Sequence, residues 1–306
     1  WDDFMGEYRP DVVHSHLFDS EMLTRYNISP NALYVTHCHY NMHQLRRFGL
    51  SDLMSSVRLS ELYERNYIVD RYEKARNHFI TISQTNLEYI KDNLPKQCEP
   101  DIHLLSNCVD LNTFGSHRAM WSEATIKLVT TGSLTQLKNQ SFLLDVVHFI
   151  SSKGVDCSLT VLGHGPLLQE LMEKCRSLGI EDRVVFKGMV SDVHEHLATH
   201  QLYVHSALSE GFGLVLVEAM AVGLPVITLD GGGNRDLIEN GLNGFMIKKH
   251  DVKEFSERIL EVCKDEPTWK EYSERCISYS QRYSISTYAD NLYDLYQDAL
   301  ANKRKP

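Results

Sequence analysis

Two glutamates with seven residues between them are the side chains in this sequence best suited to chemistry. Glu210 follows a short apolar run and lies beside Gly211 and Gly213, and Glu218 falls in the apolar segment that comes next. A carboxylate that accepts hydrogen bonds from a vicinal diol makes a strong, orienting contact. The pair therefore indicates a site for a ribose or a sugar ring.

The segment between the two glutamates also predicts an anion site. Its glycines allow the backbone to approach a ligand closely. A helix is expected from about Leu214 to Val222, because Gly223 suits a left-handed C-terminal cap and Pro225 cannot continue the helix. The free N–H groups and the positive dipole end at the start of this helix attract phosphate. An isolated pair of glutamates is more often solvated, but the glycines and the preceding strand favour a binding site.

Short apolar runs alternate with helix-length amphipathic segments along the chain. This alternation predicts parallel strands joined by right-handed crossovers, so the expected fold class is α/β with doubly wound sheets. In such sheets ligands bind outside the carboxyl ends of the strands, where the loop of Glu210 lies. Strands are expected at residues 11–16, 32–38, 78–83, 102–107, 126–132, 158–163, 183–188, 202–207, 224–230 and 244–248.

A polar stretch of little periodicity, residues 109–125, separates two series of strands. We expect an N-terminal domain over residues 1–115, a second domain over residues 116–282, and a C-terminal helix within residues 283–306 that packs back toward the first domain. The first series has fewer strands than the second, and the chain opens at Trp1 in what reads as the end of a helix. We therefore expect the opening strands of the first domain to be missing from this chain.

Composition limits the classes of partner and compartment. The formal net charge of −10 argues against nucleic acid as the main partner, because phosphate backbones attract clustered Lys and Arg. Seven scattered cysteines without a C-x-x-C pair suit a reducing compartment. No apolar run reaches the roughly 18 residues that span a bilayer. These features together predict a cytoplasmic protein.

The segment around Glu210 and Glu218 resembles the E-x7-E signature of retaining glycosyltransferases of family 4. Further pieces occur in that family's order, namely PDVVHSHL, ITIS, LSNCVDLNTF, VTTGSLTQLKNQ, VLGHGP and VVFKGMV. The resemblance implies the GT-B fold, with two Rossmann-like domains of which the N-terminal one is incomplete here. It implies transfer of a sugar from a nucleotide-diphosphate donor to the hydroxyl of a carbohydrate, glycan or lipid-linked acceptor, with retention of anomeric configuration and with no cofactor.

The resemblance assigns roles to the two glutamates and to the loop between them. Glu210 would contact the donor sugar as a catalytic residue, and Glu218 would bind the ribose hydroxyls. The backbone amides of Phe212, Gly213 and Leu214 would meet the sugar and the diphosphate at the start of the helix.

A second set of donor-binding residues follows from the same resemblance. Lys138 matches the lysine of the family's basic pair on the diphosphate, and Ser133 stands where arginine is commonest. The Ser133 hydroxyl and the Gly132 amide are expected to replace that arginine in part. Val190 matches the position whose backbone meets the base, although its side chain is expected in the core. Gly163, near Pro166, is expected only to form a turn.

Two histidine pairs end strands in the first domain. The resemblance places a histidine of the pair His37 and His39 near the donor sugar and the acceptor, and we predict both as catalytic, with preference for His39. His14 and His16 form a similar pair that we expect to be structural. An H-x-H pair can ligate a metal, but no third ligand with suitable spacing is evident, so no metal site is predicted.

Other functions remain open at this level. A non-catalytic module that binds a nucleotide sugar would share the same donor-site residues, and a sugar phosphorylase or an epimerase would share the fold. A nicotinamide-dependent dehydrogenase is disfavoured, because TGSLTQ lacks the G-x-G-x-x-G pattern. The basic stretch Leu45 to Arg58 could contact a membrane, but Asp52 interrupts it and a solvated helix face is favoured.

Overall fold

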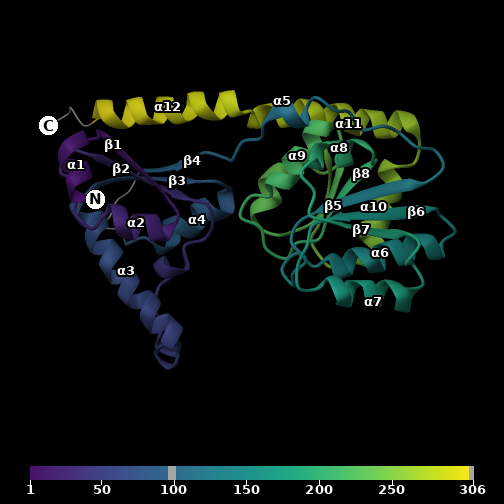
Figure 1. Cartoon of the computed structure of the whole chain (residues 1–306), viewed down its shortest axis with the longest axis horizontal. Helices are drawn as coiled ribbons and strands as arrows, with labels where there is room; N and C mark the ends of the chain where they lie inside the picture. Colours follow the sequence, from purple (N-terminus) through teal and green to yellow (C-terminus); the bar gives the residue numbers. More distant parts are fainter. Residues whose placement is uncertain (96–100, 303–306) are drawn as a thin grey trace. The chain divides into compact units, whose positions relative to one another are not determined.

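The computed structural model describes residues 1–95 and 101–302, which form two compact units (Figure 1). The first unit combines residues 1–106 with the chain from Tyr288 onward, and the second unit is Asn107–Thr287. Each unit is built on one parallel sheet, which confirms the expected α/β class. Ten strands lie in the described residues, and each overlaps an expected segment.

The first sheet has the order β1-β2-β3-β4, so β1 and β4 are its edge strands within the described residues. Its strands are β1 (Val12–His16), β2 (Leu33–Cys38), β3 (Arg76–Thr81) and β4 (Asp101–Leu104). The helices of this part of the chain are α1 (Asp2–Tyr8), α2 (Phe18–Thr24), η1 (His43–Leu45), η2 (Leu50–Met54), α3 (Ser56–Lys74), α4 (Gln84–Asn93) and α12 (Ile285–Asn302).

Successive side chains of a strand point to opposite faces of the sheet. Both faces of the first sheet carry apolar side chains, and helices cover each face. In β3, Phe79 packs with apolar residues of α2, α3 and α4, and Ile80 packs with residues of α12. Helix α12 runs along the opposite side of this sheet from α2 and α4 (Figure 1). Leu33 and Val35 of β2 are fully buried on the α12 side. The last helix of the chain thus completes the core of the first unit.

A buried polar network fastens α2 to this sheet. Arg25 and Glu21 are fully buried, and the Arg25 Nε–H group lies 3.3 Å from Glu21 Oε1. Arg25 also donates to the side chains of Asn77 and Thr36, and the Tyr72 hydroxyl donates to Glu21 Oε2 over 2.6 Å. Each charge has several partners, which is the condition for burying an ion pair without a large penalty.

The second sheet has the order β10-β9-β8-β5-β6-β7, and all its strands are parallel. Its strands are β5 (Ile126–Thr131), β6 (Cys157–Leu162), β7 (Val184–Gly188), β8 (Leu202–His205), β9 (Val226–Leu229) and β10 (Gly244–Ile247). The helices are α5 (Leu111–Phe114), α6 (Gln140–Ser152), α7 (Leu168–Leu178), α8 (Val193–Ala198), α9 (Leu214–Val222), η4 (Gly233–Leu237), α10 (Val252–Val262), α11 (Glu266–Ser280) and η5 (Gln281–Tyr283). The strand order reverses between β5 and β8, and this switch point is where such sheets bind ligands.

The stretch 109–125 contains the short helix α5, which Asp110 caps by accepting from the Asn112 N–H group. The solvated face expected over residues 45–58 holds for Arg46 and Arg47, which are exposed. It does not hold for Arg58, because its side chain is only 13% exposed and its Nε atom lies 3.3 Å from Asp52 Oδ1. Within the described residues, no helix is both long enough and apolar enough to cross a membrane.

Candidate functional site

The loop that carries Glu210 follows β8 and is held by the loop that follows β9. The Glu210 N–H group donates to the Gly231 carbonyl over 2.8 Å, and the Gly233 N–H group donates to the Glu210 carbonyl over 3.0 Å. A Cβ atom at Gly233 would lie 2.1 Å from the Gly211 carbonyl oxygen, so only glycine fits at this close approach. The Gly-rich run after β9 therefore positions Glu210.

Lys138 and His205 both contact the same oxygen of Glu210. The Lys138 ammonium forms an ion pair with Glu210 Oε1, and His205 Nε2 lies 2.9 Å from that atom. The Glu210 side chain is 11% exposed. Burial alone would raise the pKa of Glu210, but its contacts with His205 and Lys138 outweigh burial and hold that pKa below its ordinary value. Glu210 is therefore ionised at neutral pH, and no described residue makes a hydrogen bond or ion pair with its Oε2.

Backbone contacts join the loop after β5 to the loop after β8. The Leu208 N–H group donates to the Leu137 carbonyl over 2.8 Å, and the Ser206 hydroxyl donates to the Lys138 carbonyl over 2.9 Å. The aliphatic stem of Lys138 lies 3.9 Å from where a Cβ atom would stand on Gly132. The ammonium of Lys138 thus faces the Glu210 loop, as its predicted role at the diphosphate requires.

A pocket of about 350 Å³ opens beside these loops, at the carboxyl ends of β5, β6 and β7 and against α9. It brings together four of the residues predicted to bind the donor: Gly132, Ser133, Val190 and Glu218. The lining residues are Thr131, Gly132, Ser133, Leu162, Gly163, His164, Met189, Val190, Val193, Val215 and Glu218. The pocket is mostly apolar and has one carboxylate in its wall.

Glu218 is that carboxylate, and it lies on the pocket side of α9. Burial raises the pKa of Glu218 to about 7. No described residue makes a hydrogen bond or ion pair with it, whereas a half-buried carboxylate normally finds partners. A ligand with hydroxyl donors would supply them.

Two residues of the pocket differ from expectation. Val190 is half-buried and lines the pocket, so its side chain is not part of the core. Gly163 does more than form a turn: a Cβ atom there would lie 1.9 Å from the Gly132 carbonyl oxygen, and Gly163 itself lines the pocket. The close approach of the loops after β5 and β6 therefore depends on this glycine.

The loop before α9 exposes backbone rather than side chains to a ligand. Gly213 caps the helix with φ of 93°, in the left-handed region that favours glycine. The Phe212 side chain is 3% exposed and packs edge-on against Tyr283, with ring centroids 5.7 Å apart. Phe212 thus anchors the loop, and the N–H groups at Leu214 and after it begin the helix.

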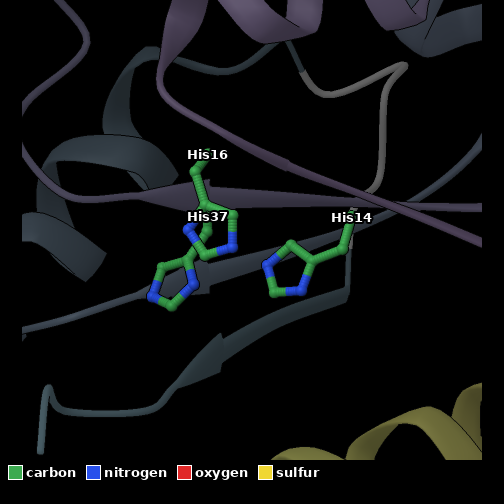
Figure 2. Close-up of side chains that lie close together, drawn as sticks. All are labelled: His14, His16 and His37. Carbon is green, nitrogen blue, oxygen red and sulfur yellow. The ribbon is translucent and has the colours of Figure 1, made fainter.

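His37 and His39 lie in the first unit, together with His14 and His16. Strands β1 and β2 pair in parallel with His16 opposite His37, so the two H-x-H pairs end side by side. His14, His16 and His37 offer nitrogen atoms within 4.8 Å of one another (Figure 2). The spacing within either H-x-H pair does not reveal a third ligand. The parallel register of β1 and β2 supplies it, because it places one pair beside the other.

Several residues of the site were not predicted from the sequence. His205 ends β8 and contacts Glu210, and its only signal is a polar residue at the end of a buried strand. Met189, Val193 and Val215 line the pocket, but in the sequence they resemble ordinary core residues. His164 lies in the turn after β6, whose glycines carried the only visible signal.

Comparisons with known proteins agree with this geometry. The chain is 25% identical over 166 residues to poly(glycerol-phosphate) alpha-glucosyltransferase of Bacillus subtilis (strain 168), which covers 54% of this chain and 25% of that protein. It is 34% identical over 149 residues to N-acetyl-alpha-D-glucosaminyl L-malate synthase of Bacillus anthracis, covering 47% and 39%. This chain therefore spans less than half the length of either relative.

A solved structure extends the likeness to both units. Anabaena HepE in complex with UDP has a TM-score of 0.77 and 19% identity, covering 97% of this chain and 81% of that one. This likeness confirms the GT-B fold. The family described as Glycosyl transferases group 1 matches residues 119–283, more than half of the 306 residues. The chain therefore belongs to the glycosyl transferases group 1 family.

Proposed function

We propose that this protein transfers a sugar from a nucleotide-diphosphate donor to an acceptor hydroxyl with retention of anomeric configuration. One observation carries the proposal: an unpartnered carboxylate, Glu218, faces an apolar pocket at the switch point of the second sheet. The pocket wall suits a nucleobase, and Glu218 suits the two hydroxyls of a ribose. UDP in the similar HepE structure and the family match support a nucleotide donor.

The diphosphate would lie between the start of α9 and Lys138. The N–H groups at Leu214 and Val215 and the helix dipole attract negative charge on one side, and the Lys138 ammonium attracts it on the other. The sugar would then reach Glu210, whose Oε2 accepts from sugar hydroxyls while Oε1 stays paired. These groups stabilise the charge that develops as the nucleoside diphosphate leaves, and no reorganisation is needed at that moment.

Retention would follow from attack on the same face as the leaving group. The bond from the anomeric carbon to the phosphate oxygen breaks, the acceptor oxygen bonds to that carbon, and the acceptor proton passes to the departing phosphate oxygen. Two relatives are named for α-linked products, which retention gives from an α-linked donor. In this proposal His39, the preferred histidine of its pair, acts on the acceptor side, and the acceptor is a carbohydrate, a glycan or a lipid-linked glycan.

The cysteines support a reducing, cytoplasmic setting as part of this proposal. The six cysteines within the described residues are all free thiols, and five of them are buried. Free buried cysteines behave as small apolar side chains and persist where disulfides do not form.

Calorimetry with UDP, GDP and ADP tests the donor site and identifies the base. Glu218→Ala should weaken binding of the preferred nucleotide by roughly 1–3 kcal/mol, the scale of lost hydrogen bonds to a charged group. Glu257→Ala removes an exposed carboxylate of α10 in the same unit and should leave affinity unchanged. Equal affinity in the Glu218→Ala variant and the unaltered protein would refute the ribose assignment. The anomeric configuration of the product, read by NMR, tests retention separately.

A further inference from the structure

Four histidine rings stack at the carboxyl ends of β1 and β2. Ring centroids are 4.4 Å apart for His14 and His16, 4.9 Å for His16 and His37, and 4.2 Å for His37 and His39. The register of the two parallel strands produces this cluster, because alternate residues of a strand share a face and His16 pairs with His37. The stack is thus a fixed product of the sheet rather than of mobile loops.

Several buried ring nitrogens of this cluster lack hydrogen-bond partners among the described residues. Both ring nitrogens of His37 are buried with no partner among the described residues, and so is Nε2 of His14. His37 is 1% exposed. A buried polar group without a partner costs free energy, so native proteins normally satisfy it with a protein group, a water or an ion.

Outer contacts of His14 and His16 leave one nitrogen of each of these two rings available. His14 Nδ1 is hydrogen-bonded to the Tyr296 hydroxyl of α12, and His16 Nδ1 lies 2.8 Å from His39 Nε2. When Nδ1 carries the proton in these contacts, the lone pair is on Nε2. Metal-ligating histidines usually hold their second ring nitrogen in this way, which fixes the tautomer and orients the ring.

We propose that His14, His16 and His37 bind one divalent transition-metal ion, with zinc as the natural occupant. Zinc–nitrogen bonds of about 2.0–2.1 Å place tetrahedral ligands roughly 3.4 Å apart. The three candidate ligand atoms lie within 4.8 Å of one another, and the three side chains that carry them lie together in Figure 2. His16 is exposed, so an ion can enter and a fourth position is open to water or another ligand.

Cobalt titration of the chelator-treated full chain, without nucleotide, tests the proposal. One equivalent of Co²⁺ should produce the intense visible d–d absorption of a four-coordinate site, and Zn²⁺ should abolish it by displacement. His16→Ala should weaken Zn²⁺ binding by more than about tenfold, because even loss of an outer partner costs 10–100-fold. Tyr296→Phe should weaken binding by about tenfold and keep the spectrum.

A matched control uses a second candidate group in the part of the chain that the structure describes. His117 and His194, with Glu195, also place ligand atoms within 4.8 Å of one another. Replacing both histidines, His117→Ala with His194→Ala, should leave the cobalt spectrum and the zinc affinity unchanged. The proposal is overturned if no d–d absorption appears, if His16→Ala keeps full affinity, or if the control variant loses the site. Because no donor is present, none of these outcomes depends on glycosyl transfer.

Discussion

In the ligand-free protein, burial disfavours the charged form of the Glu218 carboxylate. Burial raises its pKa from the ordinary 4.5 to about 7, so between these values the folded state holds more protons than the unfolded state. Stability therefore falls as the pH rises through this window. A carboxylate in this environment is suited to binding, because hydroxyl donors of a ligand replace the hydrogen bonds to water that burial removed.

Glu218→Gln should remove this pH dependence in the ligand-free protein. At pH 5 the variant and the unaltered protein should unfold at similar temperatures, since Glu218 is protonated in the folded state. At pH 8 the variant should be more stable by up to about 3 kcal/mol, the free energy of the pKa shift. Thermal unfolding at both pH values measures the difference, with Glu257→Gln as an exposed control. A stability difference of the same size at pH 5 and pH 8 would contradict the assignment.

Lys138→Ala should lower turnover by about two orders of magnitude or more. The variant loses a preorganised cation at the leaving diphosphate, and loss of one such donor costs 10²–10³-fold in kcat. It also removes one of the groups that lower the pKa of Glu210. Lys174→Ala is the matched control, because Lys174 is 28% exposed against 27% for Lys138 and pairs with Asp145 instead. Steady-state kinetics with saturating donor should separate the two variants, and equal kcat values would count against the diphosphate role.

At the scale of elements, the network around Glu21 ties α2 to β2, β3 and α3. Glu21→Ala should destabilise the first unit by about 3–5 kcal/mol, because it leaves the Arg25 guanidinium buried without its counter-charge. Asp70→Ala breaks exposed pairs with Arg71 and Lys74 and should change stability little. Denaturant unfolding followed by circular dichroism compares them. Similar midpoints for both variants would mean that the buried pair contributes no more than an exposed one.

The sequence pattern predicted the strands themselves better than it predicted where they end. All ten strands of the described residues were predicted, because a short apolar run between two helical segments is typical of a buried parallel strand. Their ends were predicted less well: the expected strand at 202–207 ends at His205, where the chain turns into the Glu210 loop. That difference of two residues hid the role of His205, which points back at Glu210.

At the scale of the whole molecule, contacts between distant segments were the part that the sequence did not reveal. Lys138 and Glu210 were both placed at carboxyl ends of strands, yet their ion pair depends on how two loops fold together. The histidine cluster depends on the register of β1 and β2, which no single motif contains. The apolar pocket wall depends on which valines leave the core. The ion pair, the histidine cluster and the pocket wall all arise from contacts between segments that lie far apart in the sequence, and a local pattern does not predict such contacts.

Removing α12 should unfold the first unit and spare the second. A chain that ends after Ser284 would uncover Leu33, Val35 and Ile80, each of which contributes about 1.5–3 kcal/mol when buried. Limited proteolysis should then cleave within residues 1–106 while residues 107–284 stay protected. A chain that ends at residue 302 keeps α12 and is the control. Protection of the first unit without α12 would show that its sheet needs no cover on that face.

The place of α12 after the second unit in the sequence also sets an order of events during synthesis on the ribosome. About 200 residues separate the end of β3, at Thr81, from Tyr288. At 5–20 residues per second, the apolar face of the first sheet waits roughly 10–40 s for its cover. The second unit is continuous in sequence and can fold during that interval. The first unit is therefore begun before the second and completed after it, and its bare face during the wait is a natural substrate for a chaperone.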